Sequence, residues 1–492
     1  MFKKTIVEVV NQVDAVMRPL FFGLMFALGL SACSSSSEEA VKAATQQSDS
    51  EEGLRAHKVL PDTTIYRDQY GTPHVVAANN YGVYFGYGYA VATDRLFQME
   101  MLRRTVEGRV AEVLGNEYLD LDKHVRTGYD HRTVSRQLTE LSKQDREILD
   151  AYAAGFSQRV GEVLSEQEIL LPKEFSDNGF LPEKWTDYDV AMIFIGSIIH
   201  RYSDFNSELD SLGLLTSLTK LHGAEKAQNI FDASKWLLDP SSPTTVPREN
   251  ALAAAERKKP VWQKKLALDE VKTKRVVLNE EGKFIGTSDS PEIQAIADAQ
   301  IAKHGFISPE YQAASNFWSV GAAKLSDADG ALVNGPQFGF GLPSYVYGIG
   351  LHGGDFDVVG NTLLALPALL FAHNNLISWG STAGMSDQVD VYREQLVEGK
   401  PDYYRHDNKD KKFETWIETI KVKDLAPVEV VAQRSVHGMV VALDSDNGTA
   451  YTRARAWEGA EVATLMAWVN LAKDKTMDAV QSRLSDVAAN IN

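Results

Sequence analysis

The chain has 492 residues, of which 44% are hydrophobic and 24% are charged, and both values are typical of soluble globular proteins. This composition excludes disordered, collagen-like and multispan membrane proteins. Asp and Glu number 67 against 50 Lys and Arg, so the formal net charge is −17. Because a negative field repels phosphate backbones, we expect no nucleic-acid partner.

The N-terminal part of the chain carries signals for export. Residues 20–32 are an apolar run shorter than the roughly 20 residues of a membrane-spanning helix, which is typical of a secretory signal peptide. The tetrad Leu-Ser-Ala-Cys that ends at Cys33 resembles a bacterial lipobox, whose cysteine is lipidated. The polar stretch at 34–58 indicates a tether. We therefore expect a signal peptide over 1–33 and a periplasmic protein that a lipid on Cys33 anchors to a membrane surface.

The first ordered elements are predicted to be two strands and then helices. Apolar and polar residues alternate on both sides of a turn at 69–73, which predicts a strand pair. Apolar residues three or four positions apart predict a helix over 92–108. Ser142 and Asp145 form a capping pair for a second helix, and the apolar run at 190–202 predicts a third, buried helix.

The second half of the chain differs from the first. Residues 248–283 are rich in charged side chains and indicate a linker. After it, short runs of β-branched and aromatic residues alternate with turn residues, which predicts strands. The Asp-Asn-Gly sequence at 446–448 predicts a hairpin, and a helix is expected again over 460–471. A helical first half and a stranded second half indicate an α+β fold.

Several fragments of catalytic motifs do not form complete sites. A Ser-x-x-Lys sequence at 217–220 would have to precede a Ser-Asp-Asn sequence, but that sequence lies before it, at 176–178. The segment at 380–384 has threonine instead of a serine nucleophile between its glycines. The Gly-x-Gly sequence at 86–88 lacks the third glycine of a nucleotide-binding loop.

A longer set of motifs runs through both halves of the chain. The motifs are RDQYGTPH (67–74), GYGYAVATDRLFQMEMLRR (86–104), AEVLG (111–115), SNFWSVGAAK (315–324), VNGPQFGF (333–340), YGIGLHG (347–353), VGNT (359–362) and ISWGSTAG (377–384). This set resembles the penicillin G acylase (penicillin amidase) family of the N-terminal-nucleophile hydrolases, from Ile65 to the last residue apart from the linker. The resemblance implies an αββα sandwich core with a helical first subunit, incomplete at the C-terminus because the chain ends partway through the family's second subunit.

The resemblance implies that Ser315 is the nucleophile. A serine hydroxyl needs a base, and the α-amino group of an N-terminal serine can serve because it titrates near ~7.7–8.0. Cleavage between Ala314 and Ser315 must come first, because the nitrogen of an intact peptide bond is not basic. Close relatives have threonine where this chain has Ala314, and Lys324 matches a lysine that the family links to maturation.

The family also implies a substrate site. The backbone N–H of Ala383 would be one donor to the oxyanion, and the second, from an asparagine side chain, would lie beyond residue 492. An apolar cup would take an aryl-acetyl group, with the backbone of Gln337 near the scissile amide. The positions that match this substrate-binding site are Gln337, Phe338, Leu370, Phe371, Ser381, Trp468, Ile491, Arg201, Tyr202 and Ile198.

A structural calcium ion, one per heterodimer, is also implied by the resemblance. Its ligands match the carboxylates of Glu208, Asp387 and Asp390 and the carbonyl of Val389, and hard oxygen ligands suit Ca²⁺. Without the resemblance, the Asp-x-x-Asp spacing would indicate only a solvated turn.

We therefore expect a first subunit over 59–255, a spacer over 256–314 and a second subunit over 315–492. The expected function is that of a self-processing amidohydrolase that cleaves penicillin G and phenylacetyl amides, with its two cleaved subunits held together as a heterodimer. Two alternatives remain open. One is an acylase for acyl-homoserine lactones, and the other is an inactive surface lipoprotein that keeps the fold.

Overall fold

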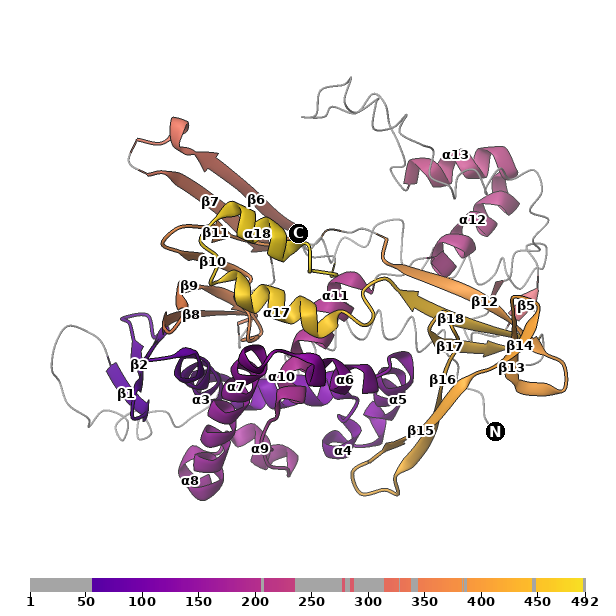
Figure 1. Cartoon of the computed structure of the whole chain (residues 1–492). Coiled ribbons are helices and arrows are strands. Elements are labelled where there is room, and N and C mark those ends of the chain that lie inside the picture. The colour runs from indigo at the N-terminus through magenta and orange to yellow at the C-terminus, as the bar shows by residue number, and fades with distance from the viewer. Residues whose placement is uncertain are drawn as a thin grey trace. The chain divides into compact units, whose positions relative to one another are not determined.

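The computed structural model, shown in Figure 1, describes most of the chain from residue 55 onward. The described residues are 55–204, 208–234, 277–278, 284–286, 314–326, 328–337, 344–382, 384, 387–444 and 448–489. The predicted signal peptide, Cys33 and nearly all of the predicted tether lie outside them, as does most of the charged linker. Within the described ranges, no helix is both long and apolar enough to cross a membrane.

The chain divides into two compact units. One comprises Met1–Glu8 and Asn206–Tyr311, and the other comprises Val9–Phe205 and Gln312–Asn492. The described part of the first unit contains α12 (Glu208–His222), α13 (Ala224–Ser234) and the antiparallel pair β4 (Val277–Leu278) and β5 (Phe284–Gly286). The second unit contains both large sheets and Ser315.

One seven-stranded sheet of the second unit joins distant parts of the sequence. β2 and β3 form the predicted antiparallel pair, and β3 then runs parallel to β8, with His74 opposite Gly350. This pairing therefore couples the helical first half to the predicted second subunit. The strands, in sheet order, are β1 (Arg55–Leu60), β2 (Thr63–Arg67), β3 (Pro73–Ala77), β8 (Val346–Gly353), β9 (Phe356–Leu363), β10 (Phe371–Asn374) and β11 (Ser378–Trp379).

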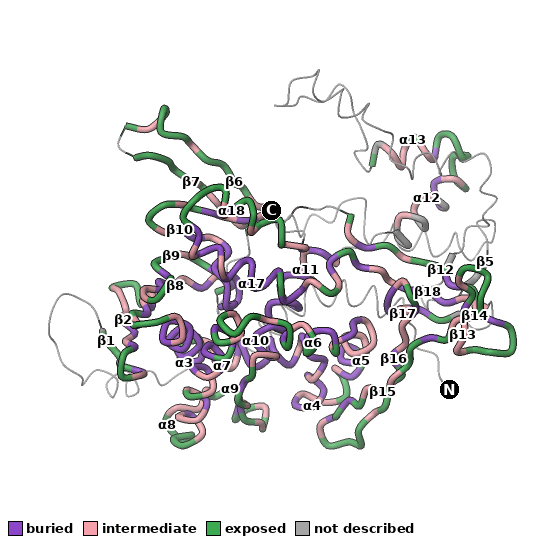
Figure 2. Tube along the Cα trace, viewed as in Figure 1, coloured by how far each residue is buried: buried purple, intermediate pink, exposed green. Residues whose placement is uncertain are grey.

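The helices predicted for the first half are confirmed, and the first is longer than predicted. α3 begins at Asn80 instead of near residue 92, and it ends as predicted at Gly108, which has a left-handed φ of 64°. Its first half is buried on nearly every side, so no helical period is visible in the sequence there (Figure 2). The side chain of Ser142 caps α7 by accepting a hydrogen bond from the N–H of Asp145, as predicted.

The apolar run at 190–202 forms a helix that is interrupted by one π-helical turn. The helices after α3 are α4 (Ala111–Leu114), η1 (Asn116–Tyr118), α5 (Leu119–Gly128), α6 (Arg132–Glu140), α7 (Lys143–Ser165), α8 (Gln167–Leu170), α9 (Lys173–Asn178), α10 (Asp187–Phe194), the π turn η2 (Ile195–Ile199) and α11 (His200–Ser203).

α3 and α7 cross at two glycines, where their backbones nearly touch. A Cβ atom added to Gly88 would lie 2.0 Å from the carbonyl oxygen of Tyr152, and one added to Gly155 would lie 1.9 Å from that of Phe85. Side chains of both helices then reach the same loop. The hydroxyl of Tyr87 donates to the carbonyl of Leu366 at 2.6 Å, and that of Tyr152 donates to the neighbouring carbonyl of Ala365 at 2.7 Å.

A second seven-stranded sheet and a separate hairpin complete the second unit. The hairpin pairs β6 (Ala314–Gly321) with β7 (Gly330–Gln337) through the turn η3 (Ala322–Lys324). β17 and β18 pair on either side of the predicted turn at 446–448. The sheet order is β14 (Lys409–Lys412), β13 (Lys400–His406), β12 (Val389–Val397), β18 (Thr449–Arg455), β17 (Met439–Asp444), β16 (Val428–Arg434) and β15 (Glu414–Ile420).

The predicted α+β class is confirmed. The predicted helix near residue 460 is α17 (Glu461–Leu471), and α18 (Met477–Leu484) follows it. α3 packs against β3, β2 and β8, so a helical layer covers the sheet that contains both halves of the chain. The second sheet of an αββα sandwich stays a prediction, because the strand of Ser315 pairs only with β7 among the described residues.

Charged side chains of α3 form a largely buried network with Glu183, which precedes α10, and with Asp189 of α10. The guanidinium groups of Arg103 and Arg104 both donate to Glu100, at 2.7 Å and 2.8 Å, and both also bind Glu183. Asp189 accepts from Arg103 at 2.9 Å. Glu107 lies at the edge of this network, where burial and then the charge of Asp189 raise its pKa to about 7.

Replacement of Gly155 by alanine is expected to lower the free energy of unfolding by about 1–3 kcal/mol, because the added methyl group must push apart two backbones. Gly161→Ala on the same helix is the matched control. No heavy atom lies within 4 Å of an added Cβ at Gly161, so alanine should stabilise the helix by about 0.5–1 kcal/mol there. Urea unfolding measures the free energy of unfolding of both variants. Equal effects of the two substitutions would contradict the close approach of the two helix backbones at Gly155.

Glu107 should make the fold less stable as the pH rises. Its pKa is about 7 in the folded chain against 4.5 for an unperturbed group, so its contribution is complete below pH 4.5 and lost as the pH rises through 7. Between pH 4.5 and 7, the free energy of unfolding of Glu107→Gln should therefore rise by up to about 3 kcal/mol relative to that of the unsubstituted protein. Unfolding curves at several pH values measure the difference, with Glu168→Gln at an exposed position as control. If the stability of Glu107→Gln depended on pH in the same way as that of the unsubstituted protein, the raised pKa of Glu107 would be refuted.

Candidate functional site

Ser315 lies at the beginning of the β6–β7 hairpin and is partly buried. It pairs with Pro336 of β7, and the preceding residue, Ala314, pairs with Gln337. Gln337 was predicted to contact the substrate through its backbone. The hairpin therefore places this predicted residue directly across from the peptide bond that is expected to be cleaved.

The hairpin is joined to the segment after β11 by the side chain of Asn334. Its Oδ1 accepts a hydrogen bond from the N–H of Ser381 at 3.2 Å, and its Nδ2 donates to the carbonyl of Ser381 at 3.3 Å. Nδ2 also donates to the carbonyl of Asn316, the residue after Ser315, at 3.3 Å. Ser381, another predicted substrate residue, is thus held close to β6, the strand that begins at Ala314 and contains Ser315.

Five predicted substrate residues belong to one hydrophobic cluster. Ile198, Leu370 and Trp468 are buried in it, while Tyr202 and Phe371 pack against it. They come from the η2 and α11 region, from the loop into β10 and from α17. Residues of the predicted first and second subunits therefore share one hydrophobic core, and their role in substrate binding stays a prediction.

Several polar atoms of the predicted substrate site are buried without a hydrogen-bond partner among the described residues. Among them are the hydroxyl of Ser381 and the indole N–H of Trp468, whose residues are 3% and 2% exposed. Such atoms cost stability unless something satisfies them. Both are therefore candidates for contact with a ligand.

A largely buried ion pair that sequence analysis missed fixes the position of α11, which carries Arg201 and Tyr202. Asp204 follows α11 and accepts hydrogen bonds from Arg455 of β18 at 2.7 Å and 2.9 Å. Burial alone would raise the pKa of Asp204, but Arg455 and Arg453 hold it below its usual value. Arg201 in turn lies over the ring of Tyr345, 5.3 Å from its centre.

For the other predicted site residues, the structure describes either no position or no contact with the rest of the site. Phe338, Ala383 and Ile491 lie outside the described residues. Lys324 is exposed in the turn η3, and Glu208 begins α12 in the other unit, where its side chain is not described.

The predicted calcium ligands of the second subunit lie around the start of β12. Asp387 and Asp390 are exposed, and among the described residues neither carboxylate has an ion pair or hydrogen bond. Val389 between them is buried. The described residues contain no group of three or more His, Cys, Asp or Glu that could hold a metal ion. Two free carboxylates suit a hard cation, but they supply only part of a ligand set.

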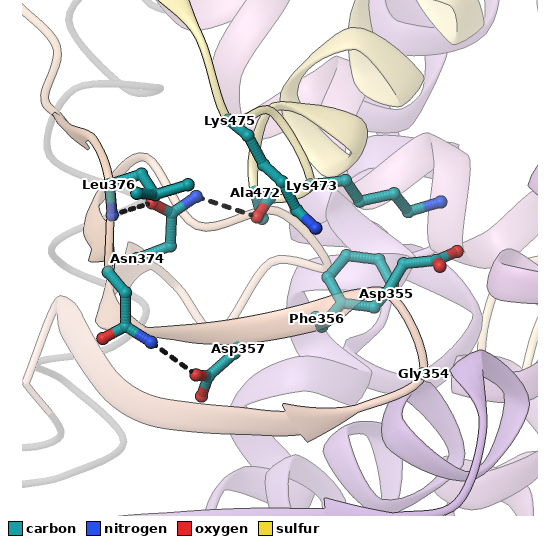
Figure 3. A pocket seen from close by; sticks show the side chains of 10 residues that line it. Gly354, Asp355, Phe356, Asp357, Asn374, Leu376, Ala472, Lys473 and Lys475 are labelled. Atoms are coloured by element: carbon teal, nitrogen blue, oxygen red, sulfur yellow. Dashed lines mark hydrogen bonds between the residues drawn. The ribbon is translucent and has the colours of Figure 1, made fainter.

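A pocket of about 550 Å³ lies elsewhere in the second unit, where the β8–β9 and β10–β11 turns meet the end of α17 (Figure 3). The ammonium group of Lys473 is 5.0 Å from the centre of the Phe356 ring at this pocket. None of the residues predicted for catalysis or substrate binding lines it.

Ser381→Ala is expected to leave the free energy of unfolding unchanged or to raise it by up to about 1 kcal/mol, because it removes a buried hydroxyl that has no partner among the described residues. Thr362→Val is the matched control. The hydroxyl of Thr362 is buried and donates to the carbonyl of Ala368 at 2.6 Å, so its loss should cost about 1–2 kcal/mol. Urea unfolding compares them, and a large loss for Ser381→Ala would show that its hydroxyl is satisfied within the protein.

Comparison with known proteins supports the resemblance found in the sequence. The model of the penicillin amidase family matches residues 62–492. Penicillin G acylase of Escherichia coli is 41% identical over 443 residues, which are 89% of this chain and 52% of that protein. The acyl-homoserine lactone acylase QuiP of Pseudomonas aeruginosa is 25% identical over 378 residues, which are 77% of this chain and 40% of that protein.

One similar solved structure is a thermostable penicillin G acylase from Alcaligenes faecalis in tetragonal form, which is 43% identical. The match covers 40% of this chain and 98% of that chain, with a TM-score of 0.35. The chain spans about half the length of the curated relatives that it matches. Since the family model matches most of the chain, the protein belongs to the penicillin amidase family.

Proposed function

We propose that the protein is the precursor of a self-processing amidohydrolase that cleaves penicillin G and related phenylacetyl amides. One observation carries this proposal: in a chain that matches the penicillin amidase family over 62–492, Ser315 lies at the beginning of β6, across from the Pro336–Gln337 end of β7. The 41% identity to a penicillin G acylase supports the choice of substrate.

The proposed reaction needs a free amine at Ser315, which cleavage after Ala314 would supply. The amine takes the proton of the serine hydroxyl as its oxygen attacks the amide carbon of the substrate. The C–N bond then breaks, and the leaving amine takes that proton and leaves an ester on Ser315. A water molecule, deprotonated by the same amine, hydrolyses the ester and releases the carboxylic acid. An amine that titrates near ~7.7–8.0 can act in both directions around neutral pH.

Two further groups complete the proposed site. The N–H of Ala383, two residues after Ser381, would donate to the developing oxyanion. The apolar residues around Leu370 and Trp468 would hold the aryl group. The hydroxyl of Ser381, which has no partner in the described ranges, would face a polar part of the substrate. The chain would act as a heterodimer of its two cleaved subunits, exported to the periplasm and anchored through Cys33.

A second candidate is hydrolysis of acyl-homoserine lactones. It is favoured by the 25% identity to acyl-homoserine lactone acylases over 77% of this chain. The two candidates share the serine chemistry and differ in the acyl group. Parallel turnover of a phenylacetyl amide and a dodecanoyl amide separates them.

Ser315→Ala is expected to abolish both processing and turnover, because the substitution removes the attacking oxygen of both reactions. Gel electrophoresis with N-terminal sequencing checks processing, and hydrolysis of phenylacetyl 4-nitroanilide checks turnover. Ser319→Ala, at an exposed position of the same strand, is the control and should behave like the unsubstituted protein. An intact, inactive unsubstituted protein would instead support an inactive lipoprotein that keeps the fold.

We also propose that Asp387, Asp390, the carbonyl of Val389 and Glu208 bind a structural calcium ion. The ion would neutralise the two carboxylates of the second subunit and attach them to the first subunit. The carboxylates of Asp387 and Asp390, which have no ion pair within the part of the chain that the structure describes, support this proposal.

Removal of calcium with a chelator should lower the unfolding temperature, and calcium addition should restore it. Asp390→Asn is expected to weaken calcium binding at least about tenfold, because it removes one of the charged oxygen ligands. Isothermal titration measures the affinity, with Asp407→Asn at an exposed carboxylate as control. Equal affinities in both variants would exclude Asp390 as a ligand.

A further inference from the structure

We infer that Asn334 is a positioning residue that fixes the nucleophile strand relative to the segment leading to the oxyanion donor. This inference rests on the proposed function, because it assigns no chemistry to Asn334 itself. The residue was not among those predicted from the sequence, although it lies in the motif at 333–340. Its side chain contacts both β6, which contains Ser315, and the segment at Ser381, and these two parts of the site must keep a fixed distance from each other.

The carboxamide of Asn334 makes three hydrogen bonds, and together they determine its orientation. Nδ2 donates to two carbonyl oxygens, those of Asn316 and Ser381, while Oδ1 accepts from the N–H of Ser381. A flipped amide would direct Oδ1 at both carbonyls, with no donor for either. The side chain therefore binds residue 381 through both of its main-chain polar groups, much as a neighbouring strand would.

The segment that receives these bonds is held firmly by the core. The indole N–H of Trp379 donates to the carbonyl of Leu369 at 2.9 Å, and Ser381 is 3% exposed. Gly380 between them has no room for a side chain, since an added Cβ would lie 2.4 Å from Oδ1 of Asn334. The glycine is thus required for Asn334 to reach the main chain of Ser381.

The hairpin on the other side of the contact is much more exposed. Phe317 and Trp318 of β6 are 48% and 52% exposed, and Val333 of β7 is 43% exposed. The side chains of the hairpin therefore pack little against the core. The hydrogen bonds from Asn334 of β7 to the core then determine where the paired strand β6, with Ser315, lies. A displacement of about 1 Å between a nucleophile and the groups that act with it can lower a rate about 100-fold.

Asn334→Asp tests the inference in the protein produced from its native gene. Aspartate has nearly the same shape but is acceptor-only when ionised, so it repels both carbonyls that Nδ2 binds. We expect kcat for phenylacetyl 4-nitroanilide to fall about 100-fold per active site, counted by phenylmethylsulfonyl fluoride titration, with KM within about threefold. Asn408→Asp, in an exposed turn of another hairpin, is the matched control and should keep full activity.

A fall in kcat at constant KM, in a variant with an unchanged unfolding temperature, distinguishes positioning from a general loss of stability. If Asn334→Asp does not fold, Gly380→Ala and Asn334→Ser disturb the same contact from either side and should show the same fall in kcat. Full activity per site in any folded variant would overturn the inference. An unsubstituted protein that neither processes nor hydrolyses the amide would overturn the proposed function and the inference with it, whereas an active protein beside a fully active Asn334→Asp overturns the inference alone.

Discussion

The close crossing of α3 and α7 is the constraint on which the rest of the second unit depends. Two glycines let the helix backbones approach until no side chain fits between them. Tyr87 and Tyr152 then extend from the two helices to consecutive carbonyls of the loop at 364–366, where Leu364 and Ala365 have positive φ angles of 51° and 54°. This strained loop connects β9 to the segment with Leu370 and Phe371. The helical layer thus determines where these predicted pocket residues lie.

Contacts between the first and second halves would hold the proposed subunits together after cleavage of the chain. β3 contributes a strand to the sheet that β8 continues, and Asp204 forms a buried ion pair with Arg455. Burial of such a pair stabilises the assembly only when both partners are present, because a single buried charge is costly. Cleavage before Ser315 would leave both interactions intact, which is why processing is compatible with this fold.

The proposed site combines a rigid part and an exposed part. The candidate pocket residues belong to the main hydrophobic cluster, whereas Ser315 lies on a hairpin with exposed aromatic side chains. A nucleophile on such a hairpin needs a defined link to the core. The bonds of Asn334 to Ser381 supply one, and they explain why a polar residue of β7 and the glycine at 380 are found together.

The sequence by itself determined the elements whose signals are local. The cap at Ser142, the stop at Gly108 and the pairing of β17 with β18 depend on signals from neighbouring residues. The nucleophile role of Ser315 stays a prediction from its motif. The first half of α3 was missed because it is buried on nearly every side and shows no period. The partners of Asn334, Asp204 and Gly88 lie far away in the sequence, so only the tertiary structure decided them. Their roles depend on which backbone and side-chain atoms the fold brings within a few ångströms, and no local pattern encodes that proximity.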